Sequence, residues 1–90
     1  MNVVVSIPSP FRRHTEGLDH LDCTVGNLQE LFDALEIRFP ELKAHLRDPD
    51  GKVRRFLNVY VNDEDIRFLG NDYLFQEGDE ITLVPSTAGG

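Results

Sequence analysis

The last six residues of the sequence, Pro85 to Gly90, carry the group whose chemistry is easiest to define. The segment reads PSTAGG and ends on two glycines, at a position where no turn requires glycine. An α-carboxylate on Gly90 is ionised at neutral pH, with a pKa near about 3.5, and its charge makes it a poor electrophile. Conversion to an acyl-adenylate inside another enzyme would make the Gly90 carbonyl reactive. The alternative is a frayed end, but the position of the Gly-Gly pair shortly after the strand-like stretch GDEITLVP favours Gly90 as a reacting residue on which partner enzymes act.

The same segment has a length and shape suited to a narrow channel. Six extended residues span roughly 20 Å, enough to reach a buried site while a folded domain stays outside. Gly89 and Gly90 lack a Cβ, so a channel can close on the bare backbone, and Pro85 stiffens the exit from the domain. The residues expected inside the partner's channel are Pro85, Ser86, Thr87, Ala88 and Gly89.

Other residue types in the sequence do not predict catalysis or metal binding. The three histidines, His14, His20 and His45, have no metal-ligand spacing, and one cysteine cannot hold an iron–sulfur cluster. Cys23 precedes a predicted helix, which would lower the pKa of its thiol, although small core cysteines are commoner than nucleophiles. We expect no bound cofactor, no metal and no enzymatic activity.

Acidic residues are concentrated in the last third of the chain. The sequence has 9 basic and 16 acidic side chains, a formal net charge of −7, and residues 62–90 hold Arg67 as their one basic side chain. This charge opposes binding to nucleic acid or anionic membrane, and the stretch Lys52, Arg54, Arg55 is too short for a nucleic-acid interface. The cluster Asp63, Glu64, Asp65 is either a solvated turn, which we favour over a cation site, or a surface that steers docking onto basic partners.

The N-terminal half predicts two strands followed by one long helix. β-branched residues over 3–8 indicate a strand, 10–17 a loop or hairpin turn, and 18–23 a second strand. Thr24 is the expected N-cap of the helix, and Pro40 ends it. The apolar residues that form one stripe at helical spacing are Leu28, Leu31, Phe32, Leu35 and Phe39.

In the C-terminal half the hydrophobic period changes to two. A short helical turn over 41–46 and a turn over 48–51 precede a half-buried strand over 56–62. We expect a turn over 62–65, a short return strand over 66–68 and a last strand over 80–84, with Ile81 and Leu83 on its buried face. The irregular segment between these strands contributes Tyr73, Leu74 and Phe75 to the core.

Length and composition are those of one small globular domain. The chain has 90 residues, 40% of them apolar, one cysteine, and no apolar run of membrane-spanning length. We therefore predict an α+β domain over 1–84, a mixed sheet wrapped over one main helix, followed by a flexible tail over 85–90. The absence of a disulfide fits a reducing compartment, so the expected location is cytoplasmic.

Several stretches together resemble a known family. The strand–turn–strand VNDEDI, the last strand EGDEITLVP and the terminal GG are similar to ubiquitin-like (β-grasp) sulfur carriers. That family includes the small subunit of molybdopterin synthase and the thiamin-pathway sulfur carrier. The stretch RRFLNVYVNDEDIRF with AGG is most similar to actinobacterial members that supply sulfur for cysteine synthesis. One departure is FLGNDYL, where several relatives have an additional glycine after Gly70.

The resemblance implies a carrier function. An ATP-dependent activating enzyme would adenylate Gly90, and sulfide or a persulfide would displace AMP to leave a thiocarboxylate. The implied client is a pyridoxal-phosphate cysteine synthase that uses O-phosphoserine, and a metalloprotease would then free cysteine and regenerate the Gly-Gly end. ATP and pyridoxal phosphate would belong to these partners. Relatives use the outward face of the sheet for partner contact, which implicates Tyr60 and Val84.

Two alternatives remain open at this point. A molybdopterin synthase small subunit would form a tight complex with a larger subunit through an apolar patch on the sheet. A ubiquitin-like modifier would be joined to lysines by an isopeptide bond. All three proteins would use the same chemical end, so the tail alone does not name the client.

Overall fold

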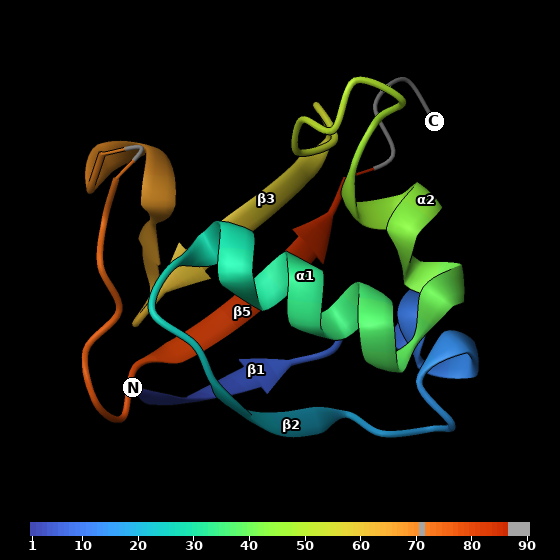
Figure 1. The fold of residues 1–90 in the computed structure, drawn as a ribbon, viewed down its shortest axis with the longest axis horizontal. Helices are drawn as coiled ribbons and strands as arrows, with labels where there is room; N and C mark the ends of the chain where they lie inside the picture. Colours follow the sequence, from blue (N-terminus) through green and yellow to red (C-terminus); the bar gives the residue numbers. More distant parts are fainter. Residues whose placement is uncertain (71, 87–90) are drawn as a thin grey trace.

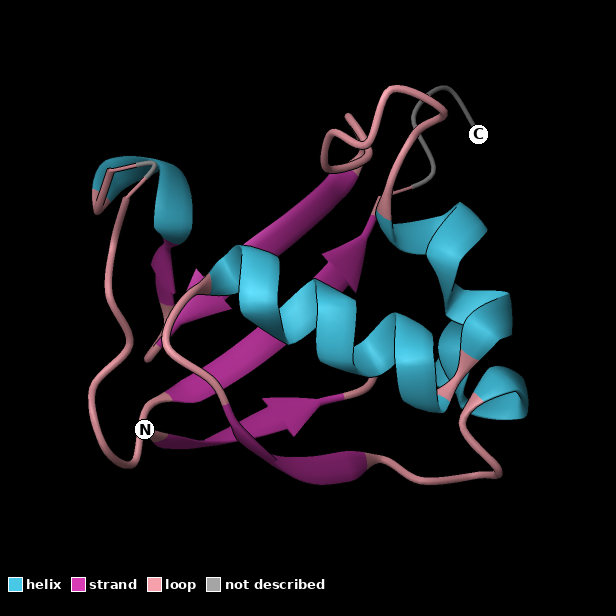
Figure 2. Cartoon of the chain, viewed as in Figure 1, coloured by secondary structure: helices cyan, strands magenta, loops and turns pink. Residues whose placement is uncertain are grey.

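The computed structural model describes residues 1–70 and 72–86, and in them a five-stranded mixed sheet packs against one long helix (Figures 1 and 2). The strand order is β2-β1-β5-β3-β4, with β1 and β5 parallel and the other neighbours antiparallel. The strands are β1 (Asn2–Ser6), β2 (His20–Thr24), β3 (Leu57–Val61), β4 (Glu64–Asp65) and β5 (Glu80–Pro85). The helices are α1 (Leu28–Arg38) and α2 (Lys43–Leu46), with 3-10 helices η1 (Ser9–His14), η2 (Pro40–Leu42) and η3 (Ile66–Phe68). This is the predicted β-grasp architecture.

The core lies between α1 and one face of the sheet, and Figure 2 shows the helix crossing that face. From the predicted stripe, Leu31, Phe32, Leu35 and Phe39 are buried, and Leu28 is half-buried against them. The sheet contributes alternate residues, as its period of two requires. Those of β3 and β5 are Leu57, Val59, Val61, Ile81 and Leu83, all buried. Both hydrophobic patterns are therefore confirmed.

The start of α1 differs from the sequence prediction. Thr24 is the last residue of β2, and the N-cap is Asn27, whose Oδ1 accepts a hydrogen bond from the Glu30 backbone N–H at 2.8 Å. The Glu30 carboxylate in turn accepts one from the Gly26 N–H at 2.7 Å. These bonds satisfy backbone donors that the first helical turn leaves open. Thr24 was wrong as the cap, whereas the end of the helix before Pro40 is confirmed.

The hairpin after β3 is tighter than predicted. Asn62 and Asp63 have φ values of 51° and 70°, so a two-residue turn places Glu64 opposite Val61. The return strand is therefore Glu64–Asp65, and residues 66–68 form η3 rather than the expected strand. The Asp65 side chain accepts a hydrogen bond from the Arg67 N–H at 2.9 Å, which caps this 3-10 turn.

Two irregular segments also differ in part from expectation. The expected loop over 10–17 contains η1, which buries Phe11 in the core. Between η3 and β5, Phe75 is buried and Tyr73 is half-buried, but Leu74 is 67% exposed, so its assignment to the core was wrong. The Phe75 backbone N–H donates to the Gly26 carbonyl at 2.8 Å. This bond holds the segment against the loop before α1, so the neighbouring Leu74 side chain is left in solvent.

Candidate functional site

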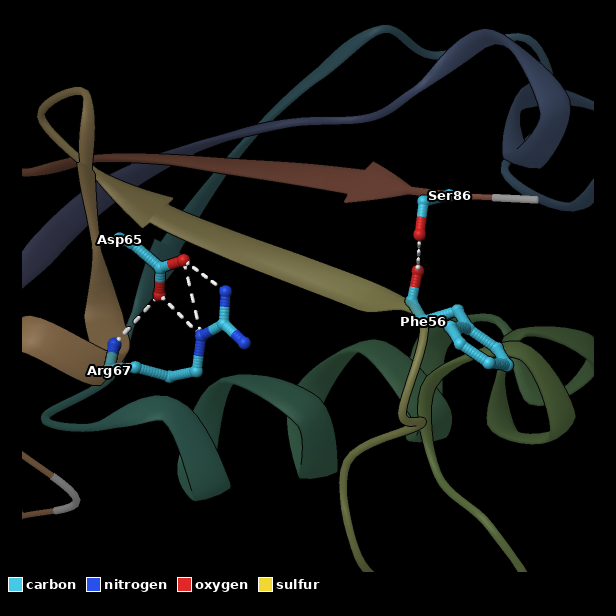
Figure 3. A network of polar contacts seen from close by, with 4 residues as sticks. All are labelled: Phe56, Asp65, Arg67 and Ser86. Carbon is cyan, nitrogen blue, oxygen red and sulfur yellow. Dashed lines mark hydrogen bonds and ion pairs between the residues drawn. The ribbon is translucent and has the colours of Figure 1, made fainter. Parts of the chain in front are cut away.

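The end of β5 is fixed to the residue that precedes β3. The Phe56 carbonyl accepts a hydrogen bond from the Ser86 hydroxyl at 3.1 Å (Figure 3). It accepts a second one from the backbone N–H of Ser86 at 2.7 Å. Because Phe56 leads directly into β3, the neighbour of β5 in the sheet, the bonds give Ser86 a defined position and direction. We call Pro85, Ser86 and Phe56 the tail root.

The expected tail over 85–90 therefore begins later than predicted. Pro85 is the last residue of β5 and lies opposite Leu57, and Ser86 continues the hydrogen bonding. Pro85 is tolerated there because β1 pairs with β5 only as far as Thr82, so the missing N–H breaks no ladder bond. Thr87, Ala88, Gly89 and Gly90 lie outside the described residues, and the expected chemistry at Gly90 stays a prediction.

The two residues expected on the outward face of the sheet lie there. In the antiparallel register Asn58 faces Val84 and Tyr60 faces Thr82, so Tyr60 and Val84 belong to the set that alternates with the buried residues. Val84 is 38% exposed and Tyr60 is half-buried. This face adjoins the tail root, and its expected role in partner contact stays a prediction.

Asp65 is not the free surface charge that the acidic cluster predicted. Its carboxylate is 9% exposed and is bound by Arg67, with Nη2–Oδ2 at 2.6 Å and Nε contacts of 3.1 and 3.2 Å to the two oxygens (Figure 3). The side-chain hydrogen bonds from Arg67, followed by the one from its backbone, lower the pKa of Asp65. The charges of Asp65 and Arg67 neutralise each other, so within this cluster only Asp63 and Glu64 present unpaired charge to solvent.

Asp79 is a second acid with a structural function. Its buried carboxylate accepts hydrogen bonds from the Tyr73 hydroxyl at 2.8 Å, Asn62 Nδ2 at 2.9 Å and the Gln76 N–H at 2.9 Å. Burial raises the pKa of Asp79, but these bonds together lower it further, and the net shift is downward. Through these hydrogen bonds the Asp79 carboxylate joins the β3–β4 turn to the loop before β5.

The exposed acids of the last third gather at the end of the sheet opposite to the tail root. Because β3 and β5 are antiparallel, Leu57 meets Pro85 at one end, and Val61 meets Ile81 at the other. The Asn62 N–H donates to the Glu80 carbonyl at 2.9 Å, so the acidic turn lies beside the start of β5. Glu80 and Pro85 are the first and last of the six residues of β5, roughly 17 Å apart along the strand.

Basic side chains surround the tail root instead, and sequence reasoning missed this cluster. A shallow pocket of about 220 Å³ is lined by residues of η1, α2, the loop before β3 and β5, among them His45, Arg54, Phe56 and Ser86. Loss of solvent, and then the charges of His14, Arg13 and Arg54, lower the pKa of His45. The only signal in the sequence was the KVRR stretch directly before β3, which had been considered for nucleic acid alone.

Cys23 has the environment of an inert thiol. It lies on β2 and is half-buried, and burial raises the pKa of its thiol although Arg38 opposes the shift. The expected lowering by a helix N-terminus was wrong, because α1 begins at Leu28 after an intervening loop. Among the described residues, no three His, Cys, Asp or Glu side chains are grouped to hold a metal ion.

A larger cavity of about 480 Å³ lies on the helix side, between the start of α1, the loop after α2 and the segment around η3. Its arginines are engaged internally: Arg47 binds Asp33 at 3.0 Å and Glu36 at 3.2 Å, and Arg67 binds Asp65. Within residues 1–70 and 72–86, no helix is both long and apolar enough to cross a membrane.

Fold and site together define a class of protein. A mixed sheet wraps over α1, and its central strand β5 delivers the chain out of the domain at a fixed point. This arrangement is that of a ubiquitin-like β-grasp protein.

Comparison with known proteins agrees with this class. Residues 5–90 match the model of the ThiS family, and the chain belongs to that family. It is 41% identical over 93 residues to the sulfur carrier protein CysO of Mycobacterium tuberculosis, with 100% of both chains covered. A CysO in a complex with BexX from Amycolatopsis orientalis matches with a TM-score of 0.85 and 42% identity, covering 98% of this chain and 99% of that one. The small archaeal modifier protein 1 of Methanosarcina acetivorans shares the fold, with a TM-score of 0.87 at 23% identity. Its family is that of ubiquitin-like sulfur carriers, and the similarity to CysO over the full chain supports a sulfur-carrier role.

Proposed function

We propose that the chain carries sulfur as a thiocarboxylate on Gly90. The Gly90 carboxylate attacks the α-phosphate of ATP in a partner enzyme, and pyrophosphate leaves. Sulfide, or a persulfide sulfur followed by reductive release, attacks the carbonyl carbon of the acyl-adenylate, the new C–S bond forms, and AMP departs. The product keeps one negative charge but is a softer and stronger nucleophile than the carboxylate.

One observation carries this proposal. The similarity to sulfur carrier proteins runs through the whole chain, and Gly90 lies four residues beyond the Ser86 anchor. Residues 87–90 extend to about 14 Å, so the reach from the folded domain is shorter than the six-residue tail suggested. A partner channel of matching depth would receive Gly90 at one fixed distance from the sheet.

The chain's own residues contribute position rather than catalysis. The Ser86–Phe56 bonds orient the exit, and Pro85 restricts the backbone just before it. The proposed partners are an ATP-dependent activating enzyme, a pyridoxal-phosphate cysteine synthase as client, and a metalloprotease that regenerates Gly90. The proposed setting is the cytoplasm. Cysteine as the product is supported by the resemblance of the β3–β4 hairpin to carriers used for cysteine synthesis.

The test is an intact-mass measurement on the purified chain with ATP, a sulfide source and the activating enzyme of its own organism. We expect one oxygen-to-sulfur exchange, located on Gly90 by fragmentation. If the species never forms with the cognate enzyme, the proposal is wrong. Lysine-linked conjugates in the native host would favour a modifier, and a tight complex with a larger subunit would favour molybdopterin synthase.

A further inference from the structure

The basic side chains around the tail root come from three separate elements. Arg13 lies on η1, His45 on α2, and Arg54 and Arg55 in the loop before β3. We call these four residues the basic collar. Tertiary folding brings them to the place where Ser86 leaves the domain, since His45 and Arg54 line the same pocket as Ser86, and His14, which follows Arg13 on η1, stacks on His45 with ring centres 4.9 Å apart.

The charge of the collar is open to solvent. Arg13, Arg54 and Arg55 are exposed, and among the described residues none of them forms an ion pair. The acid in this region, Glu41, binds His14 at 2.9 Å. By contrast, Arg47 and Arg67 are each neutralised by carboxylates of their own neighbourhood. Arg54 Nε donates a hydrogen bond to the Ala44 carbonyl at 2.9 Å, but no carboxylate of the described residues neutralises the three arginines, and like charges held together repel one another.

The collar also contains an exposed aromatic residue. Phe56 is 50% exposed, and the Arg55 guanidinium lies 5.9 Å from its ring centre. Aromatic and arginine side chains are the residue types most enriched among energetic anchors of protein interfaces. The Phe56 backbone holds Ser86, so a protein that takes in the tail must approach this side chain.

From this arrangement we propose that the ATP-dependent activating enzyme presents an acidic rim around its channel and docks on the basic collar. The inference rests on the function proposed above and adds the charge of the partner surface. The chain is a dipole: Asp63, Glu64 and Glu80 lie at the far end of β3 and β5, and the arginines lie at the tail root. An acidic rim would turn the tail toward the channel during approach, whereas a basic rim would attract the acidic end.

Arg55→Glu tests the proposal, with Arg38→Glu as the matched control. Both arginines are exposed, both lie over a phenylalanine ring, at 5.9 and 5.1 Å, and both substitutions change the net charge equally. Association with the cognate activating enzyme is measured by stopped-flow without ATP, at low and high salt, beside the melting temperature. We expect Arg55→Glu to slow association about tenfold at low salt, with the gap narrowing at high salt, and Arg38→Glu to behave as wild type.

An association rate unchanged by Arg55→Glu and by the double change Arg54→Glu/Arg55→Glu would overturn the proposal. Equal slowing by Arg38→Glu would overturn it too, because net charge alone would then explain the effect. If the collar instead binds the chain's own terminal carboxylate, Arg55→Glu should leave the association rate unchanged or raise it. Thiocarboxylate formation by the wild-type chain is measured in parallel, so failure of the sulfur-carrier chemistry is distinguished from failure of the docking model.

Discussion

The Phe56 carbonyl accepts both hydrogen bonds that Ser86 can donate, one from its backbone and one from its hydroxyl. Thirty residues separate the two positions in sequence, and the contact sets where the chain leaves the sheet. An anchor at this position controls the direction of the tail without touching the reacting carbonyl.

Changes at Ser86 should therefore affect tail delivery more than stability. Ser86→Ala keeps the backbone bond and loses the hydroxyl bond, worth about 1 kcal/mol or less at an exposed site. Ser86→Pro removes both donors, so we expect it to lower the rate of thiocarboxylate formation by roughly tenfold, and Ser86→Ala by much less. Rates and melting temperature are measured together. Equal rates for wild type and Ser86→Pro would show that the anchor has no part in delivery.

Gly90 should tolerate neither extension nor added bulk. One residue added after Gly90 moves the carboxylate by about 3.5 Å, and misplacement by even about 1 Å can cost a hundredfold in rate. Gly90→Ala keeps the carboxylate but adds a methyl group in the narrowest part of the expected channel. We expect thiocarboxylate formation to be lost on extension or deletion and reduced in Gly90→Ala, with the fold intact. A residue added before Met1 is the control, and an unprocessed extended chain that reacts normally would contradict the prediction.

Val84→Asp should weaken partner binding while leaving the fold intact. Val84 points outward at 38% exposure, so the substitution buries no charge in the core. An apolar anchor near the centre of an interface can be worth about 2 kcal/mol or more. Affinity for the activating enzyme is measured by calorimetry, with Thr82→Asp on the same strand face as a second site. A sharp fall in melting temperature would mean that the side chain packs more tightly than its exposure indicates.

Acid should destabilise the fold through Asp65 and Asp79. Both have a folded-state pKa below the unfolded value. Their contribution to the free energy of unfolding is therefore complete above the unfolded pKa of about 3.9. It is lost as pH falls through the folded values. We expect the free energy of unfolding, measured by urea titration, to drop below about pH 4, and to drop less steeply in Asp65→Asn. Asp63→Asn, at an exposed turn position, should leave the pH profile unchanged, and a shift as large as that of Asp65→Asn would contradict this assignment.

The hydrophobic patterns alone determined the class of fold. Leu31, Phe32 and Leu35 on one helix stripe, and Val59 and Leu83 on alternating strand positions, are buried as their spacing indicates. Burial of apolar surface acts on every turn of a helix and every second residue of a strand, so it leaves a repeating local signature. Reaction at Gly90 stays a prediction, drawn from the PSTAGG segment without tertiary information.

Only the tertiary structure decided which polar residues are available to partners. The Asp65 carboxylate forms an ion pair with Arg67, and the Asp79 carboxylate accepts a hydrogen bond from Tyr73. By contrast, the tail root brings together Arg13, His45 and Arg54 from positions far apart in the chain. The partner of a polar side chain leaves no periodic signal in the sequence. A single hydrogen bond or ion pair forms wherever the fold brings two groups together. The charge count therefore identified the acidic third of the sequence but not its place in the domain, since the antiparallel pairing of β3 with β5 separates the acidic turn from the tail root by the length of a strand.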